Sequence, residues 1–148
     1  MWRFRRVKKR KRVTSVTKHY LEHKELTRSL VQQRIEHYNQ HYKFGFNRIA
    51  IKNQRRCWGS CSSLKNLNFN YKLYFLPAHL QDYIVVHELC HLQELNHGEH
   101  FWSLVEQKIP NYKEAIQQLK VIDRLGSSVS VLQKVSTEYK LAVDRAGE

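Results

Sequence analysis

The sequence predicts an α+β fold in a chain the size of one domain. Its 148 residues are 41% hydrophobic, enough for one core, and include only 5 glycines and 2 prolines, which excludes collagen-like and low-complexity chains. Residues 66–75 alternate apolar and polar side chains with the two-residue period of a β-strand. Residues 80–95 repeat their many apolar side chains at helical spacing, so we expect a largely buried helix there.

The other elements follow from the same two periods. Val31 and Ile35 belong to an apolar series at helical spacing, and residues 46–52 alternate well enough for a strand. Pro77 suits the first turn of the helix at 80–95, where its missing N–H costs little. The predicted helices are 19–42, 80–95, 99–109 and 111–125. After Gly126 the remaining residues have only weak helical spacing.

Composition also indicates where the protein works. No apolar run approaches the roughly 18 residues of a membrane span, and the first twelve residues lack the apolar region of a secretory signal. Three cysteines cannot all pair within one chain, which fits a reducing compartment. We therefore expect a cytoplasmic protein with no membrane partner, and the sequence leaves its oligomeric state open.

The net charge of +13 is spread unevenly. Residues 1–76 carry 19 basic and 3 acidic side chains, whereas residues 77–148 carry 7 and 10. Eight of the basic residues lie in the first twelve positions. We therefore divide the chain into a basic N-terminal arm (1–16), a folded domain (17–125) and a C-terminal tail (126–148). The arm is either a solvated tail or a segment that binds nucleic-acid phosphate without reading sequence.

One motif carries chemistry: residues 87–91 read His-Glu-Leu-Cys-His, an HExxH pattern inside the buried helix. Because His87 and His91 are four residues apart, they share one helical face and can bind one metal ion at about 2.0 to 2.1 Å. Glu88 lies roughly 100° around the helix, beside the ion, where it can hold and deprotonate a water molecule. This is the division of roles in a zinc hydrolase.

His97, six residues after His91, is the expected third ligand, because a catalytic zinc takes three protein ligands and an open fourth position. On a continuous helix, His97 would lie about 9 Å further along the axis and could not share the ion. The helix must therefore end first, and Asn96 and Gly98 tolerate the left-handed turn that we expect there. The alternative third ligands are His100, Glu94, Glu99 and Glu106.

Other histidines and cysteines are weaker candidates. Two further histidine pairs with a spacing of four lie on a strongly polar helix with no glutamate following, so we expect solvated surface; they are His19/His23 and His37/His41. Cys57 and Cys61 have the spacing of half a structural zinc site, but no second pair exists, so we expect small buried residues. Cys90 is expected to pack in the core.

Several segments of the chain occur in a characteristic order and spacing. They are Cys57–Ser63 (CWGSCSS), Asn66–Asn70 (NLNFN), Val86–Leu92 (VHELCHL) and Asn96–Gly98 (NHG) with Phe101-Trp102. In this arrangement the chain resembles the YgjP-like metallopeptidase family, whose relatives include the SprT-like and WLM proteases. The similarity spans about residues 43–125.

The resemblance implies a small zincin-like α+β domain, with a short antiparallel sheet packed on the active-site helix that bears HExxH. It also implies one zinc ion per chain, bound by His87, His91 and His97, with Glu88 as the catalytic base. Metzincins have a glycine three residues after the second histidine. That position is Glu94 here, so the tight turn is expected later, at Asn96.

We interpret the chain as a zinc metallopeptidase, a metal-binding hydrolase that cleaves peptide bonds with a zinc-activated water and Glu88 as general base. An edge strand near residues 58–61 would hold an extended polypeptide substrate by main-chain pairing. The candidate substrate-binding residues are Trp58, Gly59 and Ser60. The residue that stabilises the oxyanion is left open among Tyr112, His100 and Arg56.

Two alternatives stay open. A metal-dependent nucleoside-triphosphate pyrophosphohydrolase would bind phosphates through the basic half of the chain, and its chemistry often favours Mg²⁺ or Mn²⁺ where three histidines favour zinc. A nucleic-acid-binding module would use a structural metal and the basic arm. Glu88 speaks against the module, since a structural metal site needs no base.

Overall fold

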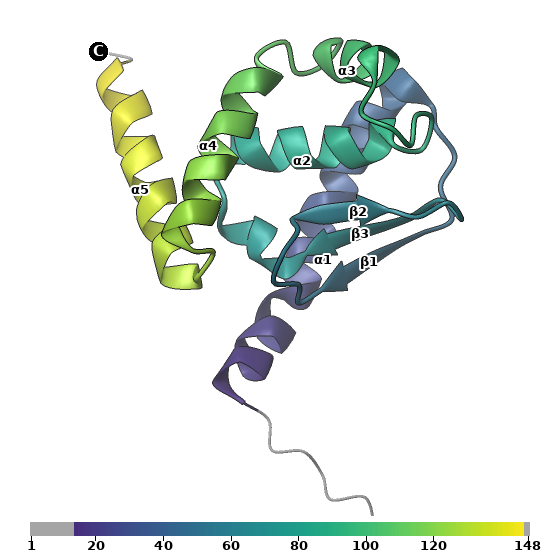
Figure 1. Ribbon diagram of the computed structural model, residues 1–148. Coiled ribbons are helices and arrows are strands. Elements are labelled where there is room, and N and C mark those ends of the chain that lie inside the picture. Colours follow the sequence, from purple (N-terminus) through teal and green to yellow (C-terminus); the bar gives the residue numbers. More distant parts are fainter. Residues whose placement is uncertain (1–13, 147–148) are drawn as a thin grey trace, which may run out of the picture.

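The computed structural model describes residues 14–146 and confirms the α+β class, with five α-helices and one three-stranded sheet in that range (Figure 1). The elements in chain order are α1 (Ser15–Tyr42), β1 (Arg48–Lys52), β2 (Gly59–Cys61), β3 (Asn66–Asn70), the 3₁₀-helix η1 (Tyr71–Phe75), α2 (Ala78–Cys90), α3 (Glu99–Glu106), α4 (Tyr112–Leu125) and α5 (Val129–Ala146). None of the helices within 14–146 is long and apolar enough to cross a membrane.

α1 begins four residues earlier than its apolar pattern predicted. The hydroxyl of Thr14 accepts a hydrogen bond from the backbone N–H of Thr17 at 3.2 Å, which caps the helix N-terminus. The helix ends where Lys43 adopts a left-handed conformation with φ of 57°. Residues 1–13 of the basic arm lie outside the described residues. The last two residues of the arm, Ser15 and Val16, already belong to α1.

The sheet is mixed, so the expected antiparallel sheet is wrong. Its strand order is β1-β3-β2, in which β2 and β3 form an antiparallel pair while β1 runs parallel to β3. After β1 the chain crosses to the far side of the sheet, builds β2, and turns back to place β3 in the middle. Alternation along one strand predicts which face is buried, but it carries no information on the direction of the neighbouring strand.

The predicted strand at 66–75 is correct only for its first half. β3 ends at Asn70, and residues 71–75 form η1 instead. The side chain of Asn70 causes the change, because its Oδ1 accepts a hydrogen bond from the N–H of Lys72 at 3.1 Å and caps the new helix. Tyr71 and Leu73 stay buried in η1, so the apolar pattern continued although the backbone changed.

The two faces of the sheet differ. Leu67 and Phe69 of β3 are fully buried on the face that packs against the helices, and α1 runs behind the sheet in Figure 1. The arginine side chain of Arg34 on α1 lies 2.9 Å from a carboxylate oxygen of Asp82 on α2, which joins the two helices under this face. The opposite face carries the alternating polar residues, and none of the helices within residues 14–146 lies in front of it (Figure 1).

The two edges of the sheet also differ. On the outer side of β1, the carbonyl oxygen of Ile51 accepts a hydrogen bond from the Tyr20 hydroxyl at 2.8 Å, and that of Ile49 accepts one from Arg28 at 3.1 Å. Side chains of α1 thus close the β1 edge. β2 forms the other edge of the sheet.

The residues after Gly126 form a complete helix, α5, although their periodicity is weak. The side chain of Leu132 is fully buried, and the helix contacts both η1 and α4. α5 therefore belongs to the packed structure.

Candidate metal centre

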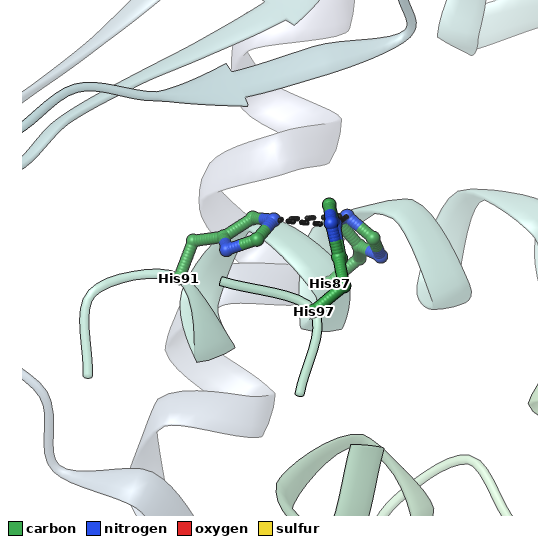
Figure 2. Close-up of side chains that lie close together, drawn as sticks. All are labelled: His87, His91 and His97. Atoms are coloured by element: carbon green, nitrogen blue, oxygen red, sulfur yellow. Dashed lines mark hydrogen bonds between the residues drawn. The ribbon is translucent and has the colours of Figure 1, made fainter. Parts of the chain in front are cut away.

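Three histidine side chains converge at the C-terminal end of α2 (Figure 2). His87 lies in the last turn of α2, His91 directly follows the helix, and His97 lies in the loop before α3. Their Nε2 atoms form a triangle with sides of 3.1 Å (His87 to His91), 3.0 Å (His91 to His97) and 3.1 Å (His97 to His87). Within the part of the chain that the structure describes, these three histidines form a group that could hold a metal ion.

The three contacts cannot all be hydrogen bonds. A neutral imidazole has either a hydrogen or a lone pair on Nε2, so among three such atoms at least two are of the same kind. Nδ1 of His91 lies 2.9 Å from the carbonyl oxygen of Glu94, which only accepts, so this ring has its hydrogen on Nδ1 and a lone pair on Nε2. A single cation that accepted a lone pair from each of the three Nε2 atoms would account for all three short distances.

The triangle also has the size and the protonation state that a metal ion needs. Three nitrogens bound tetrahedrally to zinc at 2.0 to 2.1 Å are about 3.3 Å apart, close to the distances found here. Burial, with smaller contributions from His91 and His97, lowers the pKa of His87 to about 3. Burial also lowers the pKa of His91. Both rings are therefore neutral near pH 7, the form that binds metal.

Two groups that the sequence did not reveal orient the ligands. The Tyr83 hydroxyl lies 3.1 Å from Nδ1 of His87, and the Glu94 carbonyl accepts from Nδ1 of His91. Such contacts fix the ring orientation and direct Nε2 towards the ion. Tyr83 could have been found, since it lies four residues before His87 on the same helical face, whereas a backbone carbonyl leaves no trace in the sequence.

The chain turns towards His97 earlier and differently than predicted. α2 ends at Cys90, not near residue 95, and the N–H of Leu92 bonds to the carbonyl of Leu89 in a tightened turn. Neither Asn96 nor Gly98 has a positive φ, so the expected left-handed turn is wrong. The helix does end before His97, as a shared ion requires.

α3 supports the loop that carries His97. The indole N–H of Trp102 donates to the carbonyl oxygen of His97 at 3.1 Å, and the Trp102 ring stacks on the His97 ring with centroids 5.7 Å apart. The ring of Phe101 stacks on that of His91 at 4.5 Å. Two neighbouring aromatic residues of one short helix thereby hold two of the three histidines.

The alternative third ligands are not brought to the triangle. Nδ1 of His100 lies 2.8 Å from a carboxylate oxygen of Glu94, so the two candidates engage each other at the surface. Glu99 and Glu106 lie at the two ends of α3 with exposed side chains. His97 is the residue that joins His87 and His91.

The expected exposure of the other histidines and cysteines is correct for some of them and wrong for others. His37 and His41 are exposed, as predicted, but His19 and His23 are half-buried and stack on each other at 4.2 Å against Phe75 of η1, so solvated surface is wrong for that pair. Helical spacing did not reveal that η1 covers this end of α1. Cys90 is buried as expected. Cys57 is exposed and Cys61 half-buried, so the expected burial is wrong for Cys57.

Glu88 is buried beside the triangle, pressed against strand β2. Its side chain is 5% exposed, and its Oε2 atom is buried without a hydrogen-bond partner. A Cβ atom on Gly59 would lie 2.8 Å from both Cγ and Oε1 of Glu88, so glycine is needed for this close approach. Burial raises the pKa of Glu88 to about 8. Burial and then the charge of Glu88 raise the pKa of the Cys61 thiol, which lies near the same carboxyl.

Replacing Gly59 with alanine is expected to displace the Glu88 carboxyl. Overpacking a tight site costs about 1 to 3 kcal/mol of the free energy of unfolding. Thermal melting would measure this loss. Gly45→Ala is the matched control, because nothing lies within 4 Å of a Cβ there, and it should leave the melting temperature unchanged. An unchanged melting temperature of Gly59→Ala would contradict the contact.

Of the three candidate substrate-binding residues, only Gly59 lies against Glu88. The indole N–H of Trp58 donates to Asp123 of α4 at 3.1 Å, and the Ser60 hydroxyl accepts a hydrogen bond from Asn68 at 3.2 Å on the opposite face of the sheet. Of this segment, the structure therefore brings only the backbone of Gly59 next to Glu88.

Of the three oxyanion candidates, Tyr112 is connected to the histidines through stacked rings. Its ring stacks on Trp102 with centroids 5.0 Å apart, and Trp102 in turn lies against His97. His100 is engaged with Glu94, and Arg56 lies in the loop between β1 and β2 with its side chain exposed.

Comparisons with known proteins agree with this geometry. A family model described as YgjP-like, metallopeptidase domain, matches residues 5–121. The crystal structure of the metallopeptidase zymogen of Pyrococcus abyssi abylysin is similar with a TM-score of 0.56 and 22% sequence identity, over 62% of this chain and 92% of that chain. At this identity the likeness shows a shared fold. No curated protein matches the chain.

Proposed function

The chain belongs to the YgjP-like metallopeptidase family, and on that premise we propose that it is a zinc-dependent peptidase. The observation that carries the proposal is the triangle of Nε2 atoms with sides of 3.0 to 3.1 Å, next to a buried carboxyl with a free oxygen. Three imidazole nitrogens are a donor set that suits zinc. His87, His91 and His97 would hold the ion.

Zinc in this position would act as a Lewis acid on a peptide carbonyl and lower the pKa of a water molecule to about 7. Glu88 would accept the proton of that water and return it to the leaving amine. Its free Oε2 atom leaves one oxygen available to a proton, and a positive charge beside the carboxyl favours the ionised form that a base requires. Gly59 keeps the carboxyl in place by leaving it room.

The β2 edge would hold the polypeptide substrate. Trp58 and Ser62 exchange backbone hydrogen bonds with β3 through Asn70 and Asn66, so by alternation the N–H and C=O groups of Gly59 and Cys61 point away from the sheet. An extended peptide pairing with those groups lies alongside Glu88. The β1 edge cannot compete, because α1 closes it.

The zincin-like nature of the domain and its boundaries belong to the same proposal. A basic arm (1–16), a catalytic domain (17–125) and a C-terminal tail (126–148) keep every residue of the metal centre within the central part. The packing of α5 on η1 and α4 supports a tail that stabilises the domain.

Metal analysis followed by parallel assays tests the function. The purified protein should contain about one zinc per chain and should cleave casein-like polypeptides, and a chelator should abolish the cleavage. Re-addition of zinc should restore it. Hydrolysis of nucleoside triphosphates with Mg²⁺ or Mn²⁺, without cleavage of polypeptides, would replace the peptidase by a pyrophosphohydrolase.

A further inference from the structure

The open face of the sheet presents one set of side chains on all three strands. In the register of β1 with β3, Arg48 lies beside Asn66, Ala50 beside Asn68 and Lys52 beside Asn70. In the register of β2 with β3, Ser60 lies beside Asn68. These residues share one face because side chains in register point to the same side. The face is polar, and apart from Asn70 its side chains are half-buried or exposed.

The segment that builds this face contains no acidic residue. From residue 37 to residue 81, between Glu36 and Asp82, the chain has neither aspartate nor glutamate, although it includes seven lysines and arginines. Asp82 itself is paired with Arg34 between α1 and α2. All charged side chains of the sheet and of the loops between its strands are thus basic.

Arg48 and Lys52 place one positive charge at each end of the face. Arg48 begins β1, and the neighbouring turn carries Lys65, whose carbonyl accepts a hydrogen bond from the N–H of Asn47. Lys52 ends β1, and the loop that follows carries Arg55. Four residues of strand separate Arg48 from Lys52 by about 13 Å. The side chains between them are small or are amides.

We propose that this open face binds the phosphodiester backbone of a double-stranded nucleic acid. Cations at both ends attract phosphates, and the half-buried amides of Asn66 and Asn68 and the Ser60 hydroxyl between them can hydrogen-bond to phosphate or sugar oxygens. The length of the face corresponds to about four base pairs of duplex axis. Among the described strand residues of the face there is no aromatic side chain to stack an unpaired base, and the indole of the adjacent Trp58 is held by Asp123 of α4, so a duplex is favoured over a single strand.

The face is separate from the metal centre. Gly59 meets Glu88 on the covered side of the sheet, whereas Ser60 beside it points to the open side. A duplex bound to the open face leaves Glu88 and the histidines free. The proposal therefore stands or fails independently of the peptidase assignment.

Binding of a fluorescent DNA duplex of about 20 base pairs to the full chain, measured by anisotropy between about 50 and 200 mM salt, tests the proposal. The variant Arg48→Gln/Lys52→Gln removes two exposed charges of the face. Loss of two phosphate contacts should reduce the magnitude of the log–log salt slope by about 1.8 and weaken binding roughly 60-fold at 0.1 M salt. Lys120→Gln/Lys134→Gln, on α4 and α5, removes the same charge elsewhere and should have little effect.

A second pair of variants places one negative charge without changing side-chain size. Asn68→Asp puts it at the centre of the face and should weaken binding, whereas Asn111→Asp, at the N-cap of α4, should not. Equal effects of face and control variants would overturn the proposal. So would binding that depends only on residues 1–12, or preference for an acidic polypeptide such as polyglutamate over the duplex.

Discussion

Glu88→Gln is expected to reduce turnover by about 10²- to 10⁴-fold while leaving the zinc content unchanged. The change keeps the size of the side chain, so the contact with Gly59 and the histidine triangle are preserved. It removes the carboxylate that we propose as the proton acceptor, and loss of a general base costs about 10²- to 10⁴-fold in rate. Turnover of a polypeptide substrate and zinc content, measured on the same preparation, separate the two roles.

Glu94→Gln is the matched control for this prediction. Glu94 is the other carboxylate near the site, but its side chain contacts His100 at the surface. Only its backbone carbonyl reaches a ligand, and the substitution leaves that carbonyl in place. Glu94→Gln should keep both turnover and zinc. Unchanged turnover in Glu88→Gln, with full zinc content, would remove Glu88 from the mechanism.

His97→Ala is expected to lose most of the zinc. Two ligands remain in the variant, and since disturbing the groups that orient a ligand already costs about 10- to 100-fold in metal affinity, loss of a ligand should cost more. Competition with a chromogenic chelator measures the affinity directly. His100→Ala, three residues further along the chain, should retain zinc because its ring is engaged by Glu94.

The opposite result would show that His100, and not His97, is the third ligand. If His97→Ala kept its zinc and His100→Ala lost it, the loop would have to rearrange so that His100 leaves Glu94. Loss of zinc in both variants would instead indicate that the loop folds around the ion as a unit. Melting curves with and without chelator distinguish a lost ligand from a lost fold.

The sequence was sufficient for the parts of the site that depend on one helical period. His87, Glu88 and His91 take their relative positions from the spacing of a single helix, and the end of that helix before His97 follows from the geometry of one shared ion. The form of the turn did not follow. Several backbone conformations can reverse a chain in six residues, and the one found here uses no positive φ at Asn96 or Gly98.

Contacts between distant segments account for the other errors. The apolar series of residues 66–75 is compatible with both a strand and a 3₁₀-helix, and the choice depends on one capping side chain, Asn70. The direction of β1 depends on where the chain crosses the sheet. The half-buried state of His19 and His23 depends on η1, which is remote in sequence.

The closed β1 edge also limits self-assembly. A sheet with two free edges can recruit one copy after another and grow into a filament. Here Tyr20 and Arg28 occupy the outward carbonyls of β1, so strand-to-strand addition is confined to β2. Two copies that met through β2 would each use up their single free edge, and growth would stop at a pair. The two side chains of α1 that bond to β1 therefore also oppose the growth of a fibril through this edge.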